Sequence, residues 1–497
     1  MTATSNTQPL TVDILKRKAI RIRSRKRASF YAYGVTLLTV VLWISSPPFV
    51  GFYHKFLGVV ITFLTFLPFY LWLKGNKNNF PFMELIGVHY FTIFVPPLFL
   101  DRVIFRGAPF VEIKGDTLSA TLHLIILGLV CFLVGYYYLS CFRGAILPNF
   151  CLKEEKLFKP AFCYLALAIL GNVLNLAAPS AFFKFWSILL DAGGLVAVYV
   201  LSHLYVARKF NSAEKTLYWI GLSSLVLISI GSGWLNRAAW PLVVYFAAQL
   251  EVTRKVPWLK LCGAVLLILF LQAAKEEFRI REWSSGMGTQ ARGVGQMASK
   301  SRAWITEAFQ ERPATREALV EPTLARIDHL SFFGKVVMDT PTILPYMRGQ
   351  TYLQIPAMFI PRVIWRNKPS TMSIPYVLAL RYEWIPEYLI GKVAVSAGIM
   401  DEAYINFGPG GIIVIMLFFG AFIRALVNLF SHSPGWKLVL LGIIFGGGLM
   451  ITWVSASYFG GIWQTAFVIF LMYYPFRVLR IRTNSPTQIQ MVHPSGK

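Results

Sequence analysis

Two adjacent carboxylates, Asp401 and Glu402, directly precede an apolar segment that is rich in glycine. A carboxylate that is partly removed from water at a membrane boundary holds its proton more tightly, so it can act as a general base near neutral pH. The alternative is a structural role, because carboxylates at the start of a helix are stabilised by the helix dipole. The sequence alone leaves both interpretations of Glu402 open.

His329 is the only histidine among residues 275–407 and is a second candidate base. Arg326 lies three positions earlier and therefore on the same face of a helix, and either Asp328 or Arg326 could orient the imidazole ring. Apolar residues at helical spacing predict that residues 316–339 form an amphipathic helix; they are Leu324, Ile327, Leu330, Phe333 and Val337.

Three cations, Arg362, Arg366 and Lys368, lie within seven residues in the segment 360–369, which also contains Trp365 and two prolines. Guanidinium groups bind phosphate oxygens through paired hydrogen bonds, and an indole ring can stack on a sugar or lie at the level of lipid head groups. The segment therefore predicts a binding edge for a phosphorylated sugar. The alternative is an interfacial segment whose cations contact lipid phosphates.

The composition indicates what kind of protein must position these residues. Of 497 residues, 56% are hydrophobic and only 14% charged, and the mean hydropathy is +0.56. A soluble core could not bury so much apolar surface, so the sequence predicts an all-α polytopic membrane protein. A net charge of +25 would suggest nucleic acid in a soluble protein, but here the cations lie beside apolar segments, and no nucleic-acid partner is expected.

About twelve apolar segments are long enough to predict transmembrane helices. A large, partly helical loop separates the ninth from the tenth. The predicted organisation is a basic segment at 1–28, nine helices at 29–274, the loop at 275–407, three helices at 408–476 and a tail at 477–497. The individual helices are expected at 30–47, 56–73, 80–100, 117–140, 160–178, 185–207, 216–234, 238–251, 261–275, 408–430, 438–455 and 459–476.

The distribution of lysine and arginine predicts the orientation. A dense basic run from Lys16 to Arg27 precedes the first helix, and most other cations fall in connections on the same side of a twelve-helix arrangement. By the positive-inside rule both termini are cytoplasmic and the loop faces outward. All five cysteines lie outside the loop, so we expect no disulfide in it, and the chain has no Cys-x-x-Cys pair for a metal.

Four stretches of the chain together resemble the oligosaccharide repeat-unit polymerases, the O-antigen-polymerase type of bacterial envelope enzyme. The resemblance covers residues 225–430 and elsewhere rests on the number of helices and the place of the loop. The stretches are Gly-Ser-Gly-Trp-Leu-Asn-Arg at 231–237, Gly-Gln-Thr-Tyr at 349–352, Ile-Pro-Arg-Val-Ile-Trp-Arg-Asn-Lys-Pro at 360–369 and Glu-Ala-Tyr-Ile-Asn-Phe-Gly-Pro-Gly-Gly at 402–411.

This resemblance implies a multi-pass glycosyltransferase of the bacterial inner membrane. Such an enzyme moves a glycan from an undecaprenyl diphosphate carrier to a hydroxyl of a second lipid-linked repeat unit, with no metal or other cofactor. Because the leaving group is a diphosphate, the reaction needs cations as well as a base. The expected diphosphate ligands are Arg237, Arg326, Arg362, Arg366 and Lys368, and the expected sugar contacts are Tyr352, Trp365 and Tyr404.

Glu402 is the preferred base under this resemblance, and His329 with Asp328 is the other candidate. Asp191 lies in the outer half of the sixth predicted helix; it either lines the same cavity or pairs with a nearby cation. A chain-length regulator would be a compatible partner. Two other classes of function stay open: a ligase that uses the same donor with a different acceptor, and a non-enzymatic translocator of lipid-linked sugars. The single large loop and the lack of internal repeats argue against the translocator.

Overall fold

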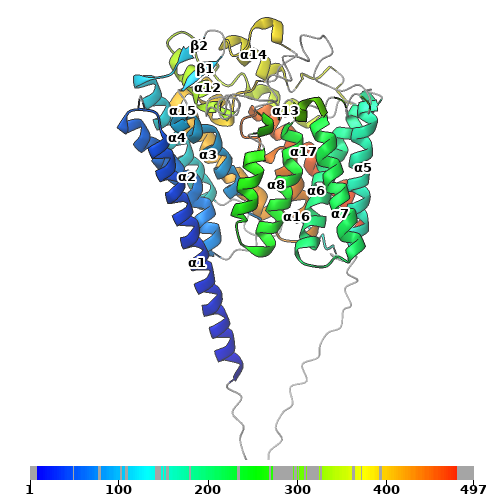
Figure 1. Ribbon diagram of the computed structural model, residues 1–497. Helices are drawn as coiled ribbons and strands as arrows, with labels where there is room; N and C mark the ends of the chain where they lie inside the picture. The colour runs from blue at the N-terminus through cyan, green and yellow to red at the C-terminus, as the bar shows by residue number, and fades with distance from the viewer. Residues whose placement is uncertain are drawn as a thin grey trace, which may run out of the picture.

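The computed structural model describes most of the apolar segments and part of the predicted loop (Figure 1). The described residues are 8–48, 50–75, 80–100, 103–106, 110–139, 147–148, 150–152, 156–177, 181–231, 235–267, 270–272, 295, 299, 302–306, 309, 324, 327–360, 364–365, 367–370, 372–390 and 395–477.

Long helices make up the first half of the chain. They are α1 (Gln8–Ser45), α2 (Phe52–Gly75), α3 (Phe82–Leu100), α4 (Gly115–Tyr138), α5 (Phe158–Ala177), α6 (Ala181–Val206), α7 (Ser212–Gly231) and α8 (Leu235–Thr253). Between α3 and α4 the strands β1 (Ile104–Arg106) and β2 (Phe110–Glu112) form an antiparallel hairpin that the sequence analysis did not predict.

Short helices follow in the predicted loop. They are α12 (His329–Asp339), η2 (Tyr352–Gln354), α13 (Ile355–Phe359), α14 (Ser373–Arg381) and η3 (Glu387–Leu389). We call the described residues from 327 to 390 the cap. The bundle is then completed by α15 (Ile399–Phe430), α16 (Pro434–Ile443), the π-helical turn η4 (Ile444–Gly448), α17 (Ser455–Tyr473) and η5 (Tyr474–Phe476).

By length and composition, seven of the described helices could cross a membrane: α1 from Ser24 onward, α2, α3, α4, α7, α15 and α17. Four shorter apolar helices accompany them, at Phe158–Leu174, Asp191–Val206, Trp258–Gln272 and Pro434–Gly448. The chain is thus a predominantly α-helical polytopic membrane protein, as the sequence predicts. The count of twelve spans stays a prediction.

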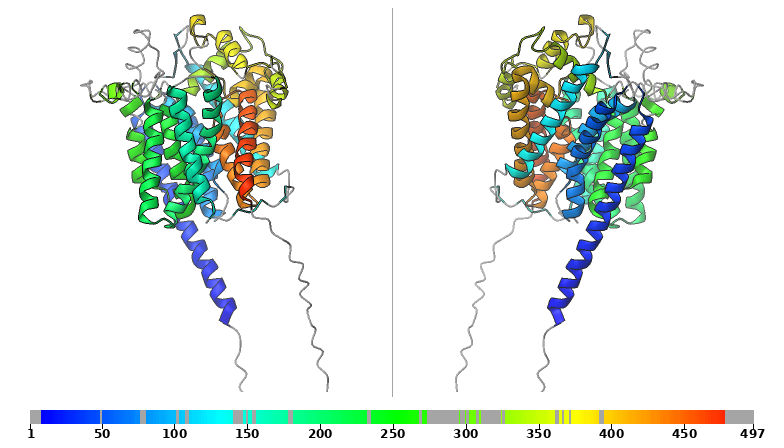
Figure 2. Two further views of the ribbon diagram at one scale, coloured as in Figure 1. Left: turned by 90° about the vertical axis from the view of Figure 1, so that its right-hand side faces the viewer. Right: turned by 90° about the vertical axis from the view of Figure 1, so that its left-hand side faces the viewer.

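The long helices lie side by side, and the cap covers one end of the bundle, with α14 farthest out (Figures 1 and 2). The N-terminal part of α1 projects from the opposite end. This basic part of the chain and the cap therefore lie on opposite sides of the apolar layer, which is the arrangement that the charge distribution predicts.

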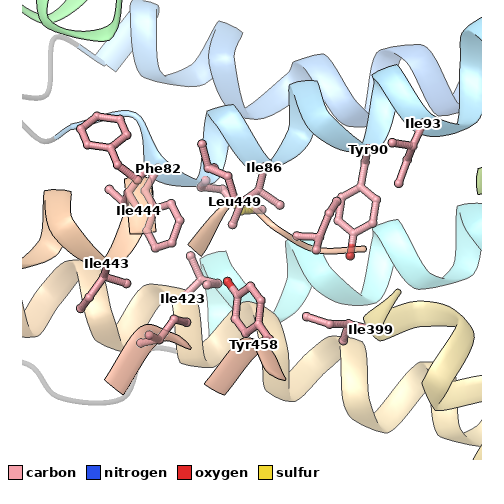
Figure 3. Close-up of a cluster of buried hydrophobic side chains, with 14 of the residues drawn as sticks. Phe82, Ile86, Tyr90, Ile93, Ile399, Ile423, Ile443, Ile444, Leu449 and Tyr458 are labelled. Atoms are coloured by element: carbon pink, nitrogen blue, oxygen red, sulfur yellow. The ribbon is translucent and has the colours of Figure 1, made fainter. Parts of the chain in front are cut away.

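The tightest contact in the bundle joins α4 and α15 through glycines. A methyl group at Gly135 would lie 2.1 Å from the carbonyl oxygen of Leu417, and one at Gly420 would lie 2.1 Å from that of Phe132. Small residues let two apolar helices approach closely enough for dense van der Waals packing where lipid supplies no hydrophobic drive. Together α3, α15 and the last helices enclose a core of large apolar side chains, ten of which Figure 3 labels, among them Tyr90, Ile399 and Tyr458.

The helix α15 begins at Ile399, nine residues before the predicted start at 408. Gly408 interrupts it with φ of +63°, a conformation that glycine adopts without steric cost, and Pro409 follows. The sequence analysis located only the apolar part after this kink. Asp401 and Glu402 consequently lie in the first turn of the helix rather than in the loop.

A second interruption separates α16 from α17. After η4, residues 449–454 are not helical, and Leu449, Ile451 and Val454 of this stretch are buried. The Tyr458 hydroxyl donates to the carbonyl oxygen of Gly448 at 2.7 Å. We call residues 449–454 the hairpin tip, because the chain turns back here between two helices that pack against each other.

Candidate functional site

Three helices begin close together where the cap meets the bundle: α12 at His329, α15 at Ile399 and α17 at Ser455. Two hydrogen bonds link the start of α15 to the chain just before α17, because Ile399 N donates to the Ile451 carbonyl at 3.0 Å and Val454 N donates to the Ser396 hydroxyl at 3.1 Å. The positive ends of three helix dipoles thus converge, and carboxylates are favoured there.

His329 and Asp401 form a short polar contact in this region. Nε2 of His329 lies 2.5 Å from Oδ2 of Asp401, and both residues are buried. Gly398 N lies 3.2 Å from the same Nε2 and 3.1 Å from the same Oδ2. So short a contact requires a proton between the nitrogen and the carboxylate, and Nε2 must therefore carry the proton and donate it to Asp401. Because a protonated Nε2 cannot accept a hydrogen bond, the Gly398 N–H donates to Asp401.

The environment of His329 favours its charged form. Burial of the ring acts to lower the pKa, but the charge of Asp401, the hydrogen bond to it and the charge of Asp328 act in the opposite direction. The net effect raises the pKa of His329 above its ordinary value. The imidazole therefore titrates closer to physiological pH than an isolated buried histidine would.

The second ring nitrogen of His329, Nδ1, is not engaged by the contact with Asp401. Within the described part of the chain, no hydrogen bond reaches Nδ1. The rings of Phe94 of α3 and of Phe332 also lie near it, each with its centroid 6.2 Å from that of the imidazole. The contact of Nε2 with Asp401 orients the imidazole and leaves Nδ1 as the nitrogen that can exchange a proton.

The absence of a side chain at Gly398 leaves the space that the imidazole of His329 occupies. A methyl group at this position would lie 2.9 Å from Nε2 of His329 and 3.1 Å from the carbonyl oxygen of Ile451. Any side chain here would displace either the imidazole or the hairpin tip. The glycine is therefore a steric requirement of the contact between His329 and Asp401.

Glu402 stabilises the start of a different helix from its own. Its side chain is fully buried, and Oε2 accepts a hydrogen bond from Ser455 N at 2.5 Å. The hydroxyls of Thr351 and Ser455 lie beside the same carboxylate. Because the first N–H groups of a helix have no partner within it, Glu402 satisfies one such group of α17. This geometry agrees with the structural interpretation of the carboxylate.

Asn406 fixes the Gly-Gln-Thr-Tyr stretch onto α15. Its side chain accepts from Gly349 N at 2.8 Å and donates to the Thr351 hydroxyl and to the Glu402 carbonyl, both at 2.8 Å. All three polar atoms that reach it come from two of the four stretches on which the family resemblance rests. The two stretches therefore form one structural unit.

Tyr352 belongs to the same unit. Its ring stacks on that of Phe407, with centroids 6.1 Å apart, and its hydroxyl is buried. Burial, followed by the charge of Glu402, raises the pKa of the Tyr352 hydroxyl, which stays protonated. The predicted contact of Tyr352 with a sugar is untested, and in this structure its ring contacts the protein.

Asp328, predicted to orient the histidine, caps the start of the helix α12, and its charge acts to raise the pKa of His329. Its two carboxylate oxygens accept from the backbone N–H and the hydroxyl of Ser331, at 2.9 and 2.6 Å. The carboxylate in contact with Nε2 of His329 is that of Asp401, which the sequence analysis grouped with Glu402 without assigning it a partner. One feature of the sequence could have indicated a structural role for Asp401. It lies three residues after Gly398, the spacing at which an acidic side chain reaches back to the start of its own helix.

Arg237 and Asp191 form a second, separate polar cluster. The Arg237 guanidinium lies 3.8 Å from Oδ2 of Asp191, and Asn172 donates to Oδ1 at 2.9 Å. These side chains join α5, α6 and α8. Of the two roles considered for Asp191, the structure shows the pairing with a nearby cation.

The other predicted ligands differ in the solvent exposure of their side chains. Lys368 is buried, and its ammonium donates to the Ile360 and Met358 carbonyls at 2.9 and 3.4 Å. The buried Tyr404 donates to the Thr340 carbonyl at 3.1 Å. Trp365 is exposed. The three remaining predicted ligands lie outside the described residues; they are Arg326, Arg362 and Arg366.

A family model described as "Domain of unknown function (DUF8712)" matches residues 121–484. The chain belongs to this family. The matched region contains the starts of α12, α15 and α17, and so the whole of the cluster around His329. No curated protein and no solved structure matches the chain. The family description names no activity.

Proposed function

We propose that the protein polymerises lipid-diphosphate-linked oligosaccharide repeat units, with His329 as the general base and Asp401 as the residue that orients it. The observation that carries this proposal is the contact between Nε2 of His329 and Asp401, because it leaves Nδ1 as the proton acceptor. In dyads of this kind the carboxylate fixes the tautomer and stabilises the imidazolium that forms.

The geometry supports His329 over Glu402 as the base. The carboxylate of Glu402 is fully buried and engaged by the start of α17, whereas His329 retains 8% of its surface. A general base must come within hydrogen-bonding distance of the hydroxyl that it deprotonates. Glu402 then acts by holding α17 and the hairpin tip against α15.

The diphosphate leaving group would be bound by arginines that the sequence predicts as ligands, Arg362, Arg366 and Arg237. Arg362 and Arg366 are the principal candidates, because guanidinium groups bind phosphate oxygens bidentately. The contacts of Lys368 with two carbonyl oxygens support a role in shaping this segment. As charge develops on the bridging oxygen, prearranged cations lower the barrier, and no metal is part of the proposed reaction.

The proposed location is the bacterial inner membrane, with twelve spans, cytoplasmic termini and the cap facing outward. What supports this orientation is the position of the basic start of α1 at the end opposite the cap (Figure 1). The donor would be an undecaprenyl diphosphate glycan in the outer half of the bilayer. A separate chain-length regulator would be a compatible partner of such an enzyme.

The test is polymer formation by the purified protein in liposomes that contain only lipid-linked repeat units. A ladder of products that differ by one repeat unit is expected, and it should disappear in the His329→Gln protein. Transfer of a finished chain to a different added acceptor, with no ladder, would identify a ligase instead. Movement of the lipid-linked substrate across the bilayer without any new glycosidic bond would identify a translocator.

A further inference from the structure

One edge of the cap carries large apolar side chains that are exposed at the protein surface. Leu353 and Ile364 are each 78% exposed, and Phe359, Ile360 and Trp365 are exposed as well. We call these five residues the apolar edge. They lie in and after η2 and α13, the part of the cap next to α17 (Figure 1). Scattered exposed apolar residues are common, but a contiguous group marks a contact surface.

The opposite side of this segment is packed firmly. Met358 is buried with Ala456 of α17, and a methyl group at Gly460 would lie 3.1 Å from Cβ of Met358. The carbonyl oxygen of Ile360 is bonded by the Lys368 ammonium at 2.9 Å. The apolar edge is therefore presented outward by a segment that is attached to the bundle.

The apolar edge continues an exposed stripe of α17. Trp463, Phe467 and Leu471 are exposed at a spacing of four residues, so they share one face of that helix. The ring of Phe359 meets that of Trp463 at 6.0 Å and 65°. The helix α17 is long and apolar enough to cross a membrane, so we expect its exposed apolar stripe to contact the hydrocarbon of the bilayer. The apolar edge extends this apolar surface beyond the start of the helix.

We infer that the apolar edge is immersed in the bilayer, where Leu353, Phe359 and Ile364 contact lipid acyl chains and Trp365 lies at the head-group level. Tryptophan is enriched at this depth because its ring is apolar and its N–H is polar. The segment is then an interfacial anchor that fixes the height of the cap above the membrane. This inference does not depend on the proposed glycosyl transfer.

If the proposed function also holds, the anchor has a direct use. Lys368, whose ammonium is bonded to the Ile360 carbonyl at the apolar edge, would lie near the depth of the phosphate groups of a lipid-linked substrate. A diphosphate at this depth would reach the cap without lifting the polyprenyl chain out of the membrane. Lipid immersion and substrate binding are thus different properties, and they are measured separately.

The test measures the depth of single spin labels on the full-length protein in liposomes of zwitterionic lipid. Labels are placed at Leu353 and Ile364 and, as controls, at Val377 and Tyr388, which are exposed on α14 and η3 of the cap. Each label is tested for collisions with oxygen, which partitions into hydrocarbon, and with a nickel chelate, which stays in water. The native cysteines are first replaced by alanine; they are Cys131, Cys141, Cys151, Cys163 and Cys262.

We expect oxygen collisions to dominate at Leu353 and Ile364 and chelate collisions to dominate at Val377 and Tyr388. Chelate collisions that dominate at Leu353 and Ile364 would overturn the inference, because the edge would then face water. Oxygen dominance at all four positions would overturn it too, since the signal would not distinguish the edge from the rest of the cap. Neither result bears on whether the protein forms a polymer.

Discussion

The imidazole of His329 and the carboxylate of Asp401 meet at 2.5 Å and join the starts of α12 and α15. One residue comes from the cap and the other from a helix long enough to cross the membrane. The contact therefore couples the position of the cap to the bundle at the point where we propose proton transfer. It also separates the roles of two adjacent carboxylates, because Asp401 faces the histidine while Glu402 faces α17.

The first prediction separates the two candidate bases. His329→Gln keeps a polar side chain but removes the titrating nitrogen, so polymer formation should fall roughly 100-fold or more. Glu402→Gln keeps an oxygen that can accept from Ser455 N, so its activity should stay close to that of the parent. Both proteins are compared at matched membrane levels by the length distribution of polymer. The reverse pattern would assign the base to Glu402 and reject the proposed role of the histidine.

The second prediction concerns the pH dependence of stability. Because the pKa of His329 in the folded protein lies above the ordinary value of 6.5, the folded state binds this proton more tightly than the unfolded state. The resulting stabilisation is complete below pH 6.5 and is lost as pH rises through the folded pKa. The difference in melting temperature between the parent and His329→Gln should therefore shrink as pH rises. A difference that grows with pH would contradict the ion pair.

The activity should follow the same titration. His329 must be neutral to accept a proton, so the rate of polymerisation should rise as pH increases through its raised pKa. Asp401→Asn removes the charge that raises this pKa, and the rising limb should move to lower pH in that variant. A profile that stays in place, at whatever maximal rate, would show that Asp401 does not act through the histidine.

A third prediction concerns the start of α17. Glu402→Ala leaves the buried Ser455 N–H without a partner, which should cost about 1–3 kcal/mol of stability, whereas Glu402→Gln should cost less because its amide oxygen can accept the same bond. The two melting temperatures measured in one detergent test this order. Equal losses in both variants would indicate that the negative charge itself, and not the hydrogen bond, is what α17 requires.

Much of the bundle could be predicted from hydropathy, since each apolar run is long enough to mark a helix and the cations mark one side. Hydropathy could not locate the start of α15. The first turns of this helix contain the polar residues Asp401, Glu402 and Asn406, which are buried by the cap and by α17 rather than by lipid. Nor could hydropathy pair His329 with Asp401, which are far apart in the chain and are brought together by the packing of three helices. Tyr404 and Lys368 contact the protein in this structure, and their roles as ligands stay predictions. Aromatic and cationic side chains serve equally well in binding and in packing, so the sequence could not separate the two.

The fourth prediction tests the space around the histidine. Gly398→Ala would place a methyl group 2.9 Å from Nε2 of His329, so the imidazole must shift and polymer formation should fall sharply. Gly410→Ala is the matched control, because a methyl group there has nothing within 4 Å and lies on the same helix. For both variants the amount of polymer formed and the melting temperature are measured. Full activity in Gly398→Ala would show that the observed position of His329 is not needed for the reaction.

The last prediction addresses orientation, on which the proposed substrate depends. Tyr388 is exposed in η3 of the cap, and Ser212 is exposed at the start of α7, in a connection that the charge distribution assigns to the cytoplasm. In a protein without its native cysteines, a cysteine at Tyr388 should react with a membrane-impermeant thiol reagent added to intact cells. One at Ser212 should react only after the membrane is opened. If Ser212 is labelled from outside and Tyr388 is protected, the cap faces the cytoplasm. A lipid-linked glycan presented at the outer surface could then not reach His329, so the proposed polymerisation would be rejected together with the orientation.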